Sequence, residues 1–415
     1  MLSVSEAQER ILAAVKKVGK ETIPVGLAEG RVLAQDVQAP FDLPLFTSSS
    51  MDGFAVDSQD IQEAAPDKPV ALSVIGEVRA GQESATAIKS GQAMRIMTGA
   101  MLPEGADAVV PVESTDQNNR GPGQAAIAQV SIIQPVQPNA FVRRMGQDVH
   151  YGQTLISAGG RLRPQEIGLL AMFGLPTIEV YRLPQIAILS TGDELLPVGV
   201  PLQPGKIYQS NSYALSAQIK QAGAKVIDLG VAPDRFETVN QLLERAIEVQ
   251  ADLIISSAGV SIGAYDFIRS VIEGQGSLDF WKVNIRPGKP FAFGQYRGVP
   301  FIGLPGNPVS AFMCFEVFAR PAVLKMTGVS TCFRKKDRVR MLEPITSDGR
   351  ESYLRAVVVN KNGNLMARLT GNQDSGNLSS LVQANAFLIV PSEVKSLPIG
   401  AELDAWLVGD VMDEE

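Results

Sequence analysis

Short apolar segments alternate with amphipathic segments over residues 183–328. The apolar segments have the length of buried strands, whereas residues 211–223 and 235–250 have the periodicity of helices. Apolar strands separated by helices are typical of a parallel sheet with helices on both sides. The pattern therefore predicts a three-layer, doubly wound α/β domain. Its clearest strands are "IAILST" (186–191), "KVIDLG" (225–230), "DLIISSA" (252–258), "LDFWKVNI" (278–285) and "PFIGL" (300–304), followed by one long helix over 307–326.

Two other regions have the pattern of strands. Residues 47–143 contain short β-type runs broken by Gly and Pro, which predict an inserted β-rich domain with a hairpin or loop at "QNNRGPGQ" (117–124). Residues 329–415 return to alternating apolar and polar positions, which predict a C-terminal β-barrel-like domain. Residues 1–46 and 144–182 contain helical patterns on either side of the insertion. We expect these two segments to form one discontinuous connecting domain of helical and extended structure.

The composition limits the class of protein. The chain has 415 residues and a net charge of −7, which argues against a general nucleic-acid or anionic-membrane binder. Charged residues interrupt the N-terminal helical pattern where a signal peptide needs an apolar core, and no apolar run approaches the length of a membrane span. We therefore expect a cytoplasmic protein. The two cysteines, Cys314 and Cys332, make no zinc motif, and Cys314 in "SAFMCFEVF" is predicted to be a packed thiol.

The stretch "GVSIG" (259–263) satisfies the G-x-S-x-G pattern of a hydrolase nucleophile elbow, between a predicted strand and a predicted helix. In that enzyme class the histidine base follows the serine along the chain. The chain contains a single histidine, His150, which precedes Ser261. A Ser261 nucleophile paired with a lysine stays open as the minor alternative, and the sequence favours a binding role for this loop.

The predicted strands end in glycine-containing loops that carry charged residues. In parallel sheets, ligands bind beyond the carboxyl ends of the strands. Clustered carboxylates favour Mg²⁺, which usually also binds substrate phosphates. Each loop alone has an ordinary interpretation as a turn or a helix start, but their convergence predicts a Mg²⁺-dependent site for a phosphorylated ligand. The loops are "STGDEL" (190–195), "LGVAPD" (229–234), "SSAGVSIGAYD" (256–266), "NIRPGKP" (284–290) and "GLPGNPVS" (303–310).

Asn307 and Pro308 predict how the last of these loops enters the helix that follows. Asn is a preferred N-cap residue, and Pro is common at the first helical position. The free N–H groups of such a helix start are suited to bind an anion.

These loops, in this order, resemble the molybdopterin molybdenumtransferase (MoeA) family, which includes the E-domain of gephyrin. The resemblance covers nearly the whole chain. It implies four domains in an elongated homodimer, with each active cleft near the dimer interface. Further segments that match are "FDLPLFTSSSMDGFAV" (41–56), "RIMTGAMLPEGADAVVPVE" (95–113), "RRMGQDV" (143–149) and "KIYQSNSYAL" (206–215).

The resemblance also implies an activity, in which adenylylated molybdopterin and molybdate give molybdenum cofactor and AMP with Mg²⁺. It assigns Glu194, Asp234 and Asp266 to catalysis and to Mg²⁺. Asp52 and Thr98, on the β-rich domain, match further catalytic positions and would complete the cleft of the partner subunit. The residues implied for the pterin and its phosphate are Gly259, Ser261, Gly263 and Asn307, and those implied for molybdate are Arg286, Lys289, Ser310, Arg355 and Ser375.

Several of these residues have a simpler interpretation when the resemblance is set aside. Asp52 and Thr98 each precede a glycine and could belong to turns, and Arg355 could be a solvated strand residue. The sequence also departs from the family pattern at Ala258, where a second glycine is usual, and at Arg286, where a lysine is common. A methyl group at 258 would be tolerated if φ were negative there.

Two alternatives to molybdenum insertion stay open from the sequence. One is a molybdopterin adenylyltransferase on a related α/β domain, and the other is a non-catalytic scaffold that keeps the fold. The expected partners of an insertase are the adenylyltransferase that supplies its substrate and the molybdoenzymes that receive the cofactor. The acids at 194, 234 and 266 favour an enzyme.

Overall fold

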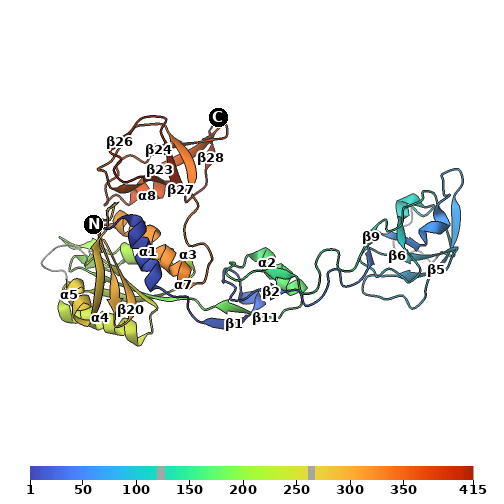
Figure 1. The fold of residues 1–415 in the computed structure, drawn as a ribbon, viewed down its shortest axis with the longest axis horizontal. Helices are drawn as coiled ribbons and strands as arrows, with labels where there is room; N and C mark the ends of the chain where they lie inside the picture. Colours follow the sequence, from blue (N-terminus) through green and yellow to red (C-terminus); the bar gives the residue numbers. More distant parts are fainter. Residues whose placement is uncertain (119–126, 260–266, 415) are drawn as a thin grey trace. The chain divides into compact units, whose positions relative to one another are not determined.

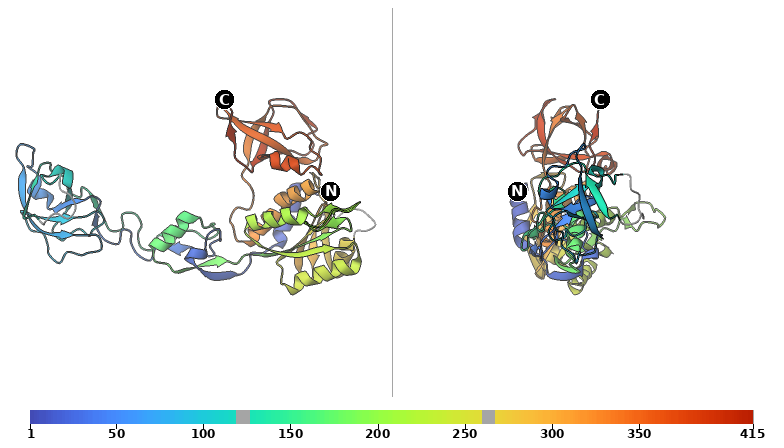
Figure 2. Two further views of the ribbon diagram at one scale, coloured as in Figure 1. Left: turned by 180° about the vertical axis from the view of Figure 1, so that it is seen from behind. Right: turned by 90° about the vertical axis from the view of Figure 1, so that its right-hand side faces the viewer.

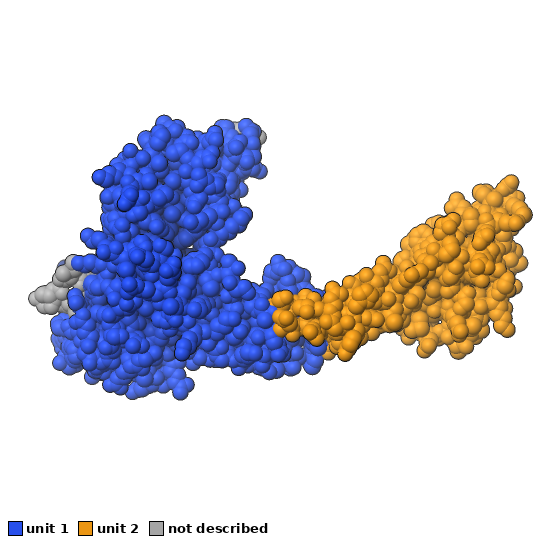
Figure 3. Space-filling model, in the orientation of Figure 1, with its two compact units in different colours: residues 1–35, 158–171, 175–415 blue, residues 36–157, 172–174 orange. Residues whose placement is uncertain are grey.

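The computed structural model describes residues 1–118, 127–259 and 267–414. The chain forms two compact units, which Figure 3 distinguishes by colour. The larger unit contains residues 1–35, 158–171 and 175–415, and the smaller contains residues 36–157 and 172–174. Within the described residues, no helix has the length and apolar content needed to cross a membrane.

The centre of the larger unit is a sheet with the strand order β15-β12-β16-β20-β19-β17. β15, β12, β16 and β20 are parallel neighbours, which confirms the strands predicted for this part. The predicted parallel arrangement does not extend to β19, which is antiparallel to both β20 and β17. The strands are β12 (Gln185–Thr191), β15 (Lys225–Ala232), β16 (Leu253–Ser257), β17 (Gly276–Lys282), β19 (Pro290–Tyr296) and β20 (Val299–Leu304).

β19 was not predicted from the sequence because a tight hairpin joins it to β20. Tyr296 pairs with Val299, so the turn between β19 and β20 consists of Arg297 and Gly298. Both turn residues have positive φ, 46° and 83°, as a two-residue hairpin turn of type I′ requires. Arginine is an unusual first residue for that turn, and the sequence therefore contains no strong hairpin signal here.

Helices cover both faces of the sheet (Figure 1). Ala187 and Leu189 of β12 face a core that includes α4 and α5, while the alternate residues Ile186 and Ile188 face the core of α1, α3, α6 and α7. α1 lies in a segment predicted to belong to the connecting domain, but its buried face packs in this second core. The helices are α1 (Val4–Ala14), α3 (Asn211–Ala222), α4 (Phe236–Glu248), α5 (Phe267–Gln275), α6 (Pro308–Cys314) and α7 (Arg320–Met326).

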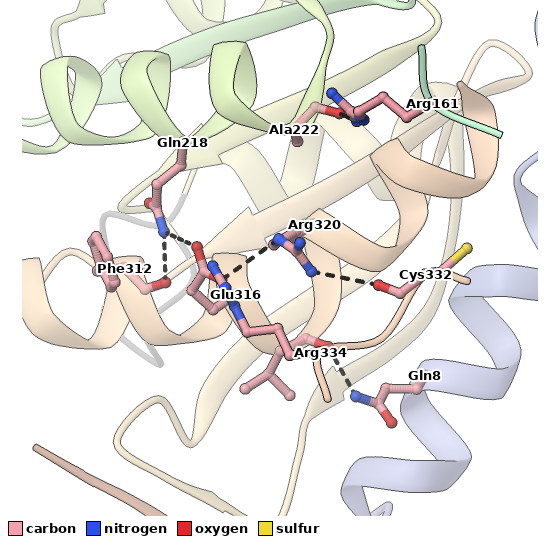
Figure 4. Close-up of polar contacts among 10 residues, drawn as sticks. Gln8, Arg161, Gln218, Ala222, Phe312, Glu316, Arg320, Cys332 and Arg334 are labelled. Atoms are coloured by element: carbon pink, nitrogen blue, oxygen red, sulfur yellow. Dashed lines mark hydrogen bonds and ion pairs between the residues drawn. The ribbon is translucent and has the colours of Figure 1, made fainter. Parts of the chain in front are cut away.

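The long helix predicted over 307–326 contains a π-helical turn at Phe315–Ala319, between α6 and α7. Pro321 has no N–H to donate to the carbonyl of Val317, four residues earlier. Gln8 of α1 donates to that carbonyl instead, over 2.9 Å (Figure 4). A side chain from another helix thus satisfies the acceptor that the proline leaves open.

Glu316 lies in the same π-helical turn and is 3% exposed. Its carboxylate accepts from Gln218 at 2.8 Å and from Arg334 at 2.9 Å (Figure 4). Gln218 belongs to α3, and Arg334 belongs to the segment between α7 and the C-terminal strands. This buried ion pair therefore holds the segment that leads to the C-terminal domain against the α/β core.

The C-terminal strands close into a barrel in the order β23-β24-β21-β27-β25, because β25 also pairs with β23 (Figure 2). This confirms the predicted barrel-like domain. β18 (Ile285–Arg286) pairs with the start of β23, and Phe387 and Trp406 of the barrel join the α/β core, so that the barrel is packed on the α/β domain. The barrel strands are β21 (Asp337–Met341), β23 (Glu351–Lys361), β24 (Asn364–Leu369), β25 (Ala386–Val390) and β27 (Glu402–Leu407).

The smaller unit contains a β-sheet in the order β7-β4-β6-β5-β8, in agreement with the predicted β-rich domain. Most of the predicted loop at 117–124 lies outside the described residues. The strands are β3 (Ser48–Ser49), β4 (Gly53–Val56), β5 (Val70–Val78), β6 (Gln92–Ile96), β7 (Ala108–Pro111), β8 (Gln129–Ile132) and β9 (Val142–Arg143).

Short elements complete each unit. In the larger unit, β1 (Lys20–Pro24) pairs with β11 (Thr177–Tyr181) beside α2 (Pro164–Met172). In the smaller unit, β2 (Val37–Gln38) pairs with β10 (Thr154–Ile156). The remaining helix and strands of the larger unit are α8 (Ser379–Gln383), β13 (Leu195–Leu196), β14 (Ile207–Tyr208), β22 (Ile345–Thr346), β26 (Ser396–Leu397) and β28 (Met412–Asp413).

Candidate functional site

The predicted ligand residues of the α/β domain follow one another along the carboxyl edge of the sheet. The strand order β15-β12-β16-β20 places Asp234 and Glu194 at one end of this edge and Asn307 at the other. Gly259, which follows β16, lies between them. The chain leaves β12 for β15 on one side and returns to β16 on the other, so the topological switch point lies between β12 and β16. Crevices at such switch points are the usual ligand sites of doubly wound sheets.

Three carboxylates gather at the β12–β15 end of the edge. The backbone N–H of Asp234 donates to Asp193 Oδ1 at 3.3 Å. The Glu194 carboxylate folds back over Gly192, which has φ +143°. A Cβ at residue 192 would lie 2.5 Å from Glu194 Oε2. Partial burial, followed by the charges of Asp193 and Glu194, raises the pKa of Asp234. Mutual repulsion among these acids is the electrostatic setting that a divalent cation relieves.

The metal site itself remains a prediction. Within residues 1–118, 127–259 and 267–414, no group of three or more His, Cys, Asp or Glu side chains converges closely enough to hold a metal ion. Asp266, the third predicted ligand, lies outside the described residues, as do Ser261 and Gly263. Asp193, which the sequence placed at this edge but did not assign to the metal, is in contact with Asp234.

The backbone is left-handed at two consecutive residues after β16. Gly259 has φ +78°, and a Cβ there would lie 2.4 Å from Ile268 Cδ1, so a larger residue would be strained and would displace the Ile268 side chain. Ala258 has φ +77°, which excludes the negative φ under which its methyl group would be tolerated without strain. A non-glycine residue in this conformation is strained by about 1–2 kcal/mol. Ala258 thus holds a backbone shape for which glycine is the better residue.

A pocket of about 310 Å³ lies between the α/β domain and the barrel. The α/β domain contributes the loop 286–290 and the start of α6, and the barrel contributes residues of β23 and the loop 373–375. Every residue predicted for molybdate lines this pocket, together with Asn307. They are Arg286, Lys289, Ser310, Arg355 and Ser375.

The loop "RPGKP" is held in place by the α/β core. The peptide bond between Arg286 and Pro287 is cis. Gly288 has φ +109°, and a Cβ there would lie 2.2 Å from Cys314 Sγ. The Cys314 thiol is fully buried, its pKa is raised by that burial, and it donates to the carbonyl of Gly288 over 3.7 Å. The prediction of a packed thiol at Cys314 is confirmed, and the thiol also supports the anion-binding loop.

Arg355 is 1% exposed, so the interpretation as a solvated strand residue is wrong. Its Nη1 donates to Gln373 O and its Nη2 to Asn372 O and Asp374 O, over 3.1 to 3.3 Å. Its Nε donates to Ser380 Oγ at 3.0 Å. A guanidinium has five N–H donors. Arg355 makes four hydrogen bonds to protein atoms of the described residues. Arg355 therefore shapes the loop 372–374 and adds positive charge to the pocket.

Asn307 occupies the N-cap position of α6, with Pro308 in the first turn. The predicted N-cap position is confirmed, but the Asn307 side chain makes no capping hydrogen bond to any described residue. Instead Asn307 Nδ2 donates to Ser375 Oγ at 2.9 Å. The N–H of Val309 donates to Ser375 O at 3.1 Å, so one donor of the helix start is already used. The barrel loop thus occupies one donor of the helix start, while Ser310 of the same turn lines the pocket.

Arg350 and Gln373 also line the pocket and were not predicted from the sequence. Arg350 donates to the carbonyl of Ile285 at 3.0 Å and pairs with Asp348. Gln373 accepts from the N–H of Arg355 at 3.0 Å and donates to its carbonyl at 3.1 Å, as a strand neighbour would. In the sequence both residues belong to Gly-, Asp- and Asn-containing stretches that are typical of surface turns. Their position in the pocket depends on how the barrel packs on the α/β domain.

Asp52 and Thr98 form a separate pair on the smaller unit. The backbone N–H and the hydroxyl of Thr98 donate to Asp52 Oδ1 at 2.7 and 2.8 Å. These hydrogen bonds lower the pKa of Asp52, so the carboxylate is ionised at neutral pH. Both residues are exposed. The two side chains bond to each other, and their catalytic role stays a prediction.

Family models match three consecutive parts of the chain. They are the MoeA N-terminal region (domain I and II) at residues 2–174, a probable molybdopterin binding domain at 187–325 and the MoeA C-terminal region (domain IV) at 338–408. Molybdopterin molybdenumtransferase 2 of Mycobacterium tuberculosis is 37% identical over 413 residues, which cover 98% of this chain and 99% of that protein. The chain belongs to the molybdopterin molybdenumtransferase family.

Other members of this family are similar to the chain over nearly its full length. The molybdopterin molybdenumtransferase of Haemophilus influenzae is 35% identical over 405 residues, which cover 96% of this chain and 97% of that protein. Two solved structures of MoeA proteins from Pyrococcus horikoshii superpose with TM-scores of 0.83 and 0.81, at 33% and 28% identity, over 99% and 98% of this chain and all of theirs. The resemblance stated from the sequence is confirmed, and the protein is a transferase of this family.

Proposed function

We propose that the protein inserts molybdenum into molybdopterin, with adenylylated molybdopterin and molybdate as substrates and molybdenum cofactor and AMP as products. The observation that carries the proposal is the pocket between the α/β domain and the barrel. It brings together Arg286, Lys289, Ser310, Arg355 and Ser375 from segments far apart in the chain. A chain with a net charge of −7 here concentrates guanidinium, ammonium and hydroxyl donors.

These donors suit a tetrahedral oxyanion. Arg286 and Lys289 supply positive charge from one loop, and Arg350 and Arg355 add charge from the barrel side. Charged donors make the stronger hydrogen bonds to oxyanions, and serine hydroxyls adapt to the remaining oxygen atoms. Because Arg286 replaces the usual lysine, it offers a planar pair of N–H groups where a lysine offers a point charge.

The acids at the other end of the edge support the second half of the reaction. Cleavage of a phosphoanhydride requires that its negative charge be neutralised, and Mg²⁺ would supply that charge when bound. Glu194, Asp234 and Asp266 are the residues proposed to hold it. The raised pKa of Asp234 supports this proposal, because clustered carboxylates without a cation repel one another. The switch point between β12 and β16 lies between the acids and the anion pocket and suits the pterin and its phosphate.

Further parts of the proposal concern the assembly. We propose a cytoplasmic homodimer in which Asp52 and Thr98 complete the cleft of the partner subunit. A molybdopterin adenylyltransferase would supply the substrate, and molybdoenzymes would receive the cofactor. The family matches on both sides of the α/β domain support insertion over adenylyl transfer, because both are matches to MoeA regions.

AMP release from adenylylated molybdopterin tests the function directly. The purified protein is assayed with molybdate and Mg²⁺, each added or withheld, and molybdenum is measured on the recovered pterin. Release that depends on both supports the insertase. Pyrophosphate released from ATP and molybdopterin would identify the adenylyltransferase, and pterin binding without AMP would identify the scaffold.

A pocket variant adds a site-specific control to that assay. Lys289→Met removes a pocket cation and is expected to raise the molybdate KM about tenfold or more, as the loss of a charged hydrogen bond predicts. Lys361→Met removes an exposed lysine at the far end of β23 and is expected to leave the KM unchanged. An equal effect of both substitutions would contradict the proposed pocket.

A further inference from the structure

We propose that Asn211 is a positioning residue of the active site, which fixes the end of β16 relative to the turn after β20. Asn211 Nδ2 donates to Ser257 Oγ at 2.9 Å and to the carbonyl of Gly306 at 2.7 Å. The proposal rests on the proposed function, because these two segments carry the residues assigned to the pterin and to the anion pocket. Asn211 belongs to the matching segment "KIYQSNSYAL", for which the sequence suggested no role.

The position of Asn211 in its helix makes these bonds informative. Asn211 is the first residue of α3, directly after the N-cap Ser210, and a short polar side chain at a helix start commonly bonds to backbone groups nearby. Ser210, at the N-cap, makes no side-chain capping hydrogen bond to any described residue. Both N–H groups of the Asn211 amide are directed to the ends of two neighbouring strands instead. The helix start thus contributes its polar side chain to the carboxyl edge of the sheet.

Each acceptor lies next to a predicted ligand residue. Ser257 ends β16, two residues before Gly259, and Gly306 directly precedes Asn307. The two segments also contact each other directly. The N–H of Ala258 donates to Leu304 O at 3.1 Å, and a Cβ at Gly306 would lie 3.3 Å from the Ala258 methyl group. Asn211 is the side chain that spans both segments.

The hydrogen bonds continue from Gly306 into the anion pocket. Asn307 donates to Ser375 Oγ at 2.9 Å, and the carbonyl of Ser375 accepts from Val309. The preceding loop residues, Asn372 to Asp374, are held by the buried Arg355. The turn that Asn211 fixes is therefore the same turn on which the barrel loop is seated. A shift of this turn would displace pocket donors contributed by both domains.

Asn211→Asp and Asn211→Ala test the proposal. Asp has the same shape but cannot donate, so it faces the carbonyl of Gly306 with an acceptor, whereas Ala removes the contact. A displacement of 1 Å at a catalytic site can lower the rate about 100-fold, and we expect a partial release of the turn to raise the molybdate KM about tenfold in both variants. Ser212→Ala is the matched control on the same helical turn, because the buried Ser212 hydroxyl has no hydrogen-bond partner among the described residues.

The readouts separate a positioning role from a merely structural one. A structural role would lower the folded, active fraction and leave the KM of the remaining enzyme unchanged. A positioning role changes the KM while thermal unfolding shows a fully folded protein. An unchanged molybdate KM in both Asn211 variants, or an equal increase in Ser212→Ala, would overturn the proposal.

The same proteins also distinguish failure of the inference from failure of the proposed function. If the wild type releases no molybdate-dependent AMP, the proposed function fails, and calorimetric titration with molybdate alone then tests Asn211. Weaker molybdate binding by the two Asn211 variants than by wild type and Ser212→Ala would still support positioning of the pocket. Equal binding by all four proteins would overturn it.

Discussion

Asn307 donates from its side-chain amide to the hydroxyl of Ser375 over 2.9 Å, and so joins the turn after β20 to a loop of the C-terminal barrel. Ser375 also accepts from the N–H of Val309 through its carbonyl, so the barrel loop is seated on the first turn of α6. The anion pocket exists because this loop and the "RPGKP" loop face each other across it. Its donors are therefore sensitive to changes at this contact.

The first prediction concerns the charge of this contact. Asn307→Asp is expected to keep the contact with Ser375, because the Ser375 hydroxyl can then donate to the Asp carboxylate. Asp is also a favoured N-cap residue. The free energy of unfolding should change by less than about 0.5 kcal/mol. A negative charge beside the pocket should raise the molybdate KM about tenfold or more. Asn362→Asp, on a barrel hairpin away from the pocket, is the control, and an equal KM change in both would contradict the pocket assignment.

The second prediction concerns the strain at Ala258. Ala258→Gly is expected to stabilise the protein by roughly 1 kcal/mol, because glycine adopts φ +77° without a steric penalty. Denaturant unfolding measures the change. Ala13→Gly in α1, at an exposed helical position, should have the opposite sign, with a loss of about 0.5–1 kcal/mol. A loss of stability in both variants would show that residue 258 is not strained.

The third prediction concerns the repulsion at Asp234. Because the pKa of this carboxyl is raised in the folded protein, its ionised form destabilises the fold. The destabilisation is absent below the ordinary Asp pKa of about 4, grows as the pH rises through the raised folded pKa, and is constant above it. Asp234→Asn should therefore unfold at a higher temperature than wild type at neutral pH, and this difference should disappear towards pH 4.

The same variant should fail to release AMP, and added Mg²⁺ should raise the unfolding temperature of wild type but not of Asp234→Asn. Asp228→Asn is the control, because this exposed residue of β15, the strand that precedes Asp234, keeps an oxygen acceptor for the N–H of Gly230. Full activity of Asp234→Asn would refute the assignment of this residue to the metal.

The fourth prediction concerns the buried guanidinium of Arg355. Arg355→Lys keeps the charge but cannot reach the carbonyls of Asn372, Gln373 and Asp374 together. We expect a loss of roughly 2–4 kcal/mol of unfolding free energy together with weaker molybdate binding. Ser380→Ala removes the acceptor of Nε and also the hydroxyl that donates to the carbonyl of Asn377 at 2.6 Å. It should lose about 1–3 kcal/mol, with the loop carbonyls still bound to Arg355. A fully stable Arg355→Lys protein would show that the loop does not depend on the guanidinium.

The fifth prediction concerns the ion pair in the π-helical turn. Glu316→Gln removes the negative charge between Arg334 and Gln218 and should lower the free energy of unfolding by about 1.5–3 kcal/mol. Asp279→Asn breaks the exposed pair with Arg10 and should lower it by less than about 1 kcal/mol. Equal effects in denaturant unfolding would mean that burial of Glu316 does not strengthen its pairing.

The sequence by itself determined most strands and helices of the α/β domain, though not β19, and which residues follow the carboxyl ends of its strands. Apolar segments of strand length and helical periodicity report burial along the chain, and strand order then brings Glu194, Asp234, Gly259 and Asn307 to one edge. Arg286, Lys289, Ser310, Arg355 and Ser375 were named from family motifs, and they line a common pocket. The strands and helices follow from periodicity, and the anion-binding residues follow from short motifs. Both are patterns of residues that lie close together in the sequence.

Only the tertiary structure decided how individual side chains and peptides are used. Arg355 is buried because a loop from the same domain folds over it, and Asn307 turns from its helix to Ser375 because the barrel is packed there. The left-handed φ of Ala258 and the bonds of Asn211 likewise depend on neighbouring strands that are distant in sequence. Periodicity describes one element at a time, whereas these features arise where elements meet, and the contacts there select one conformation among several that the local sequence permits.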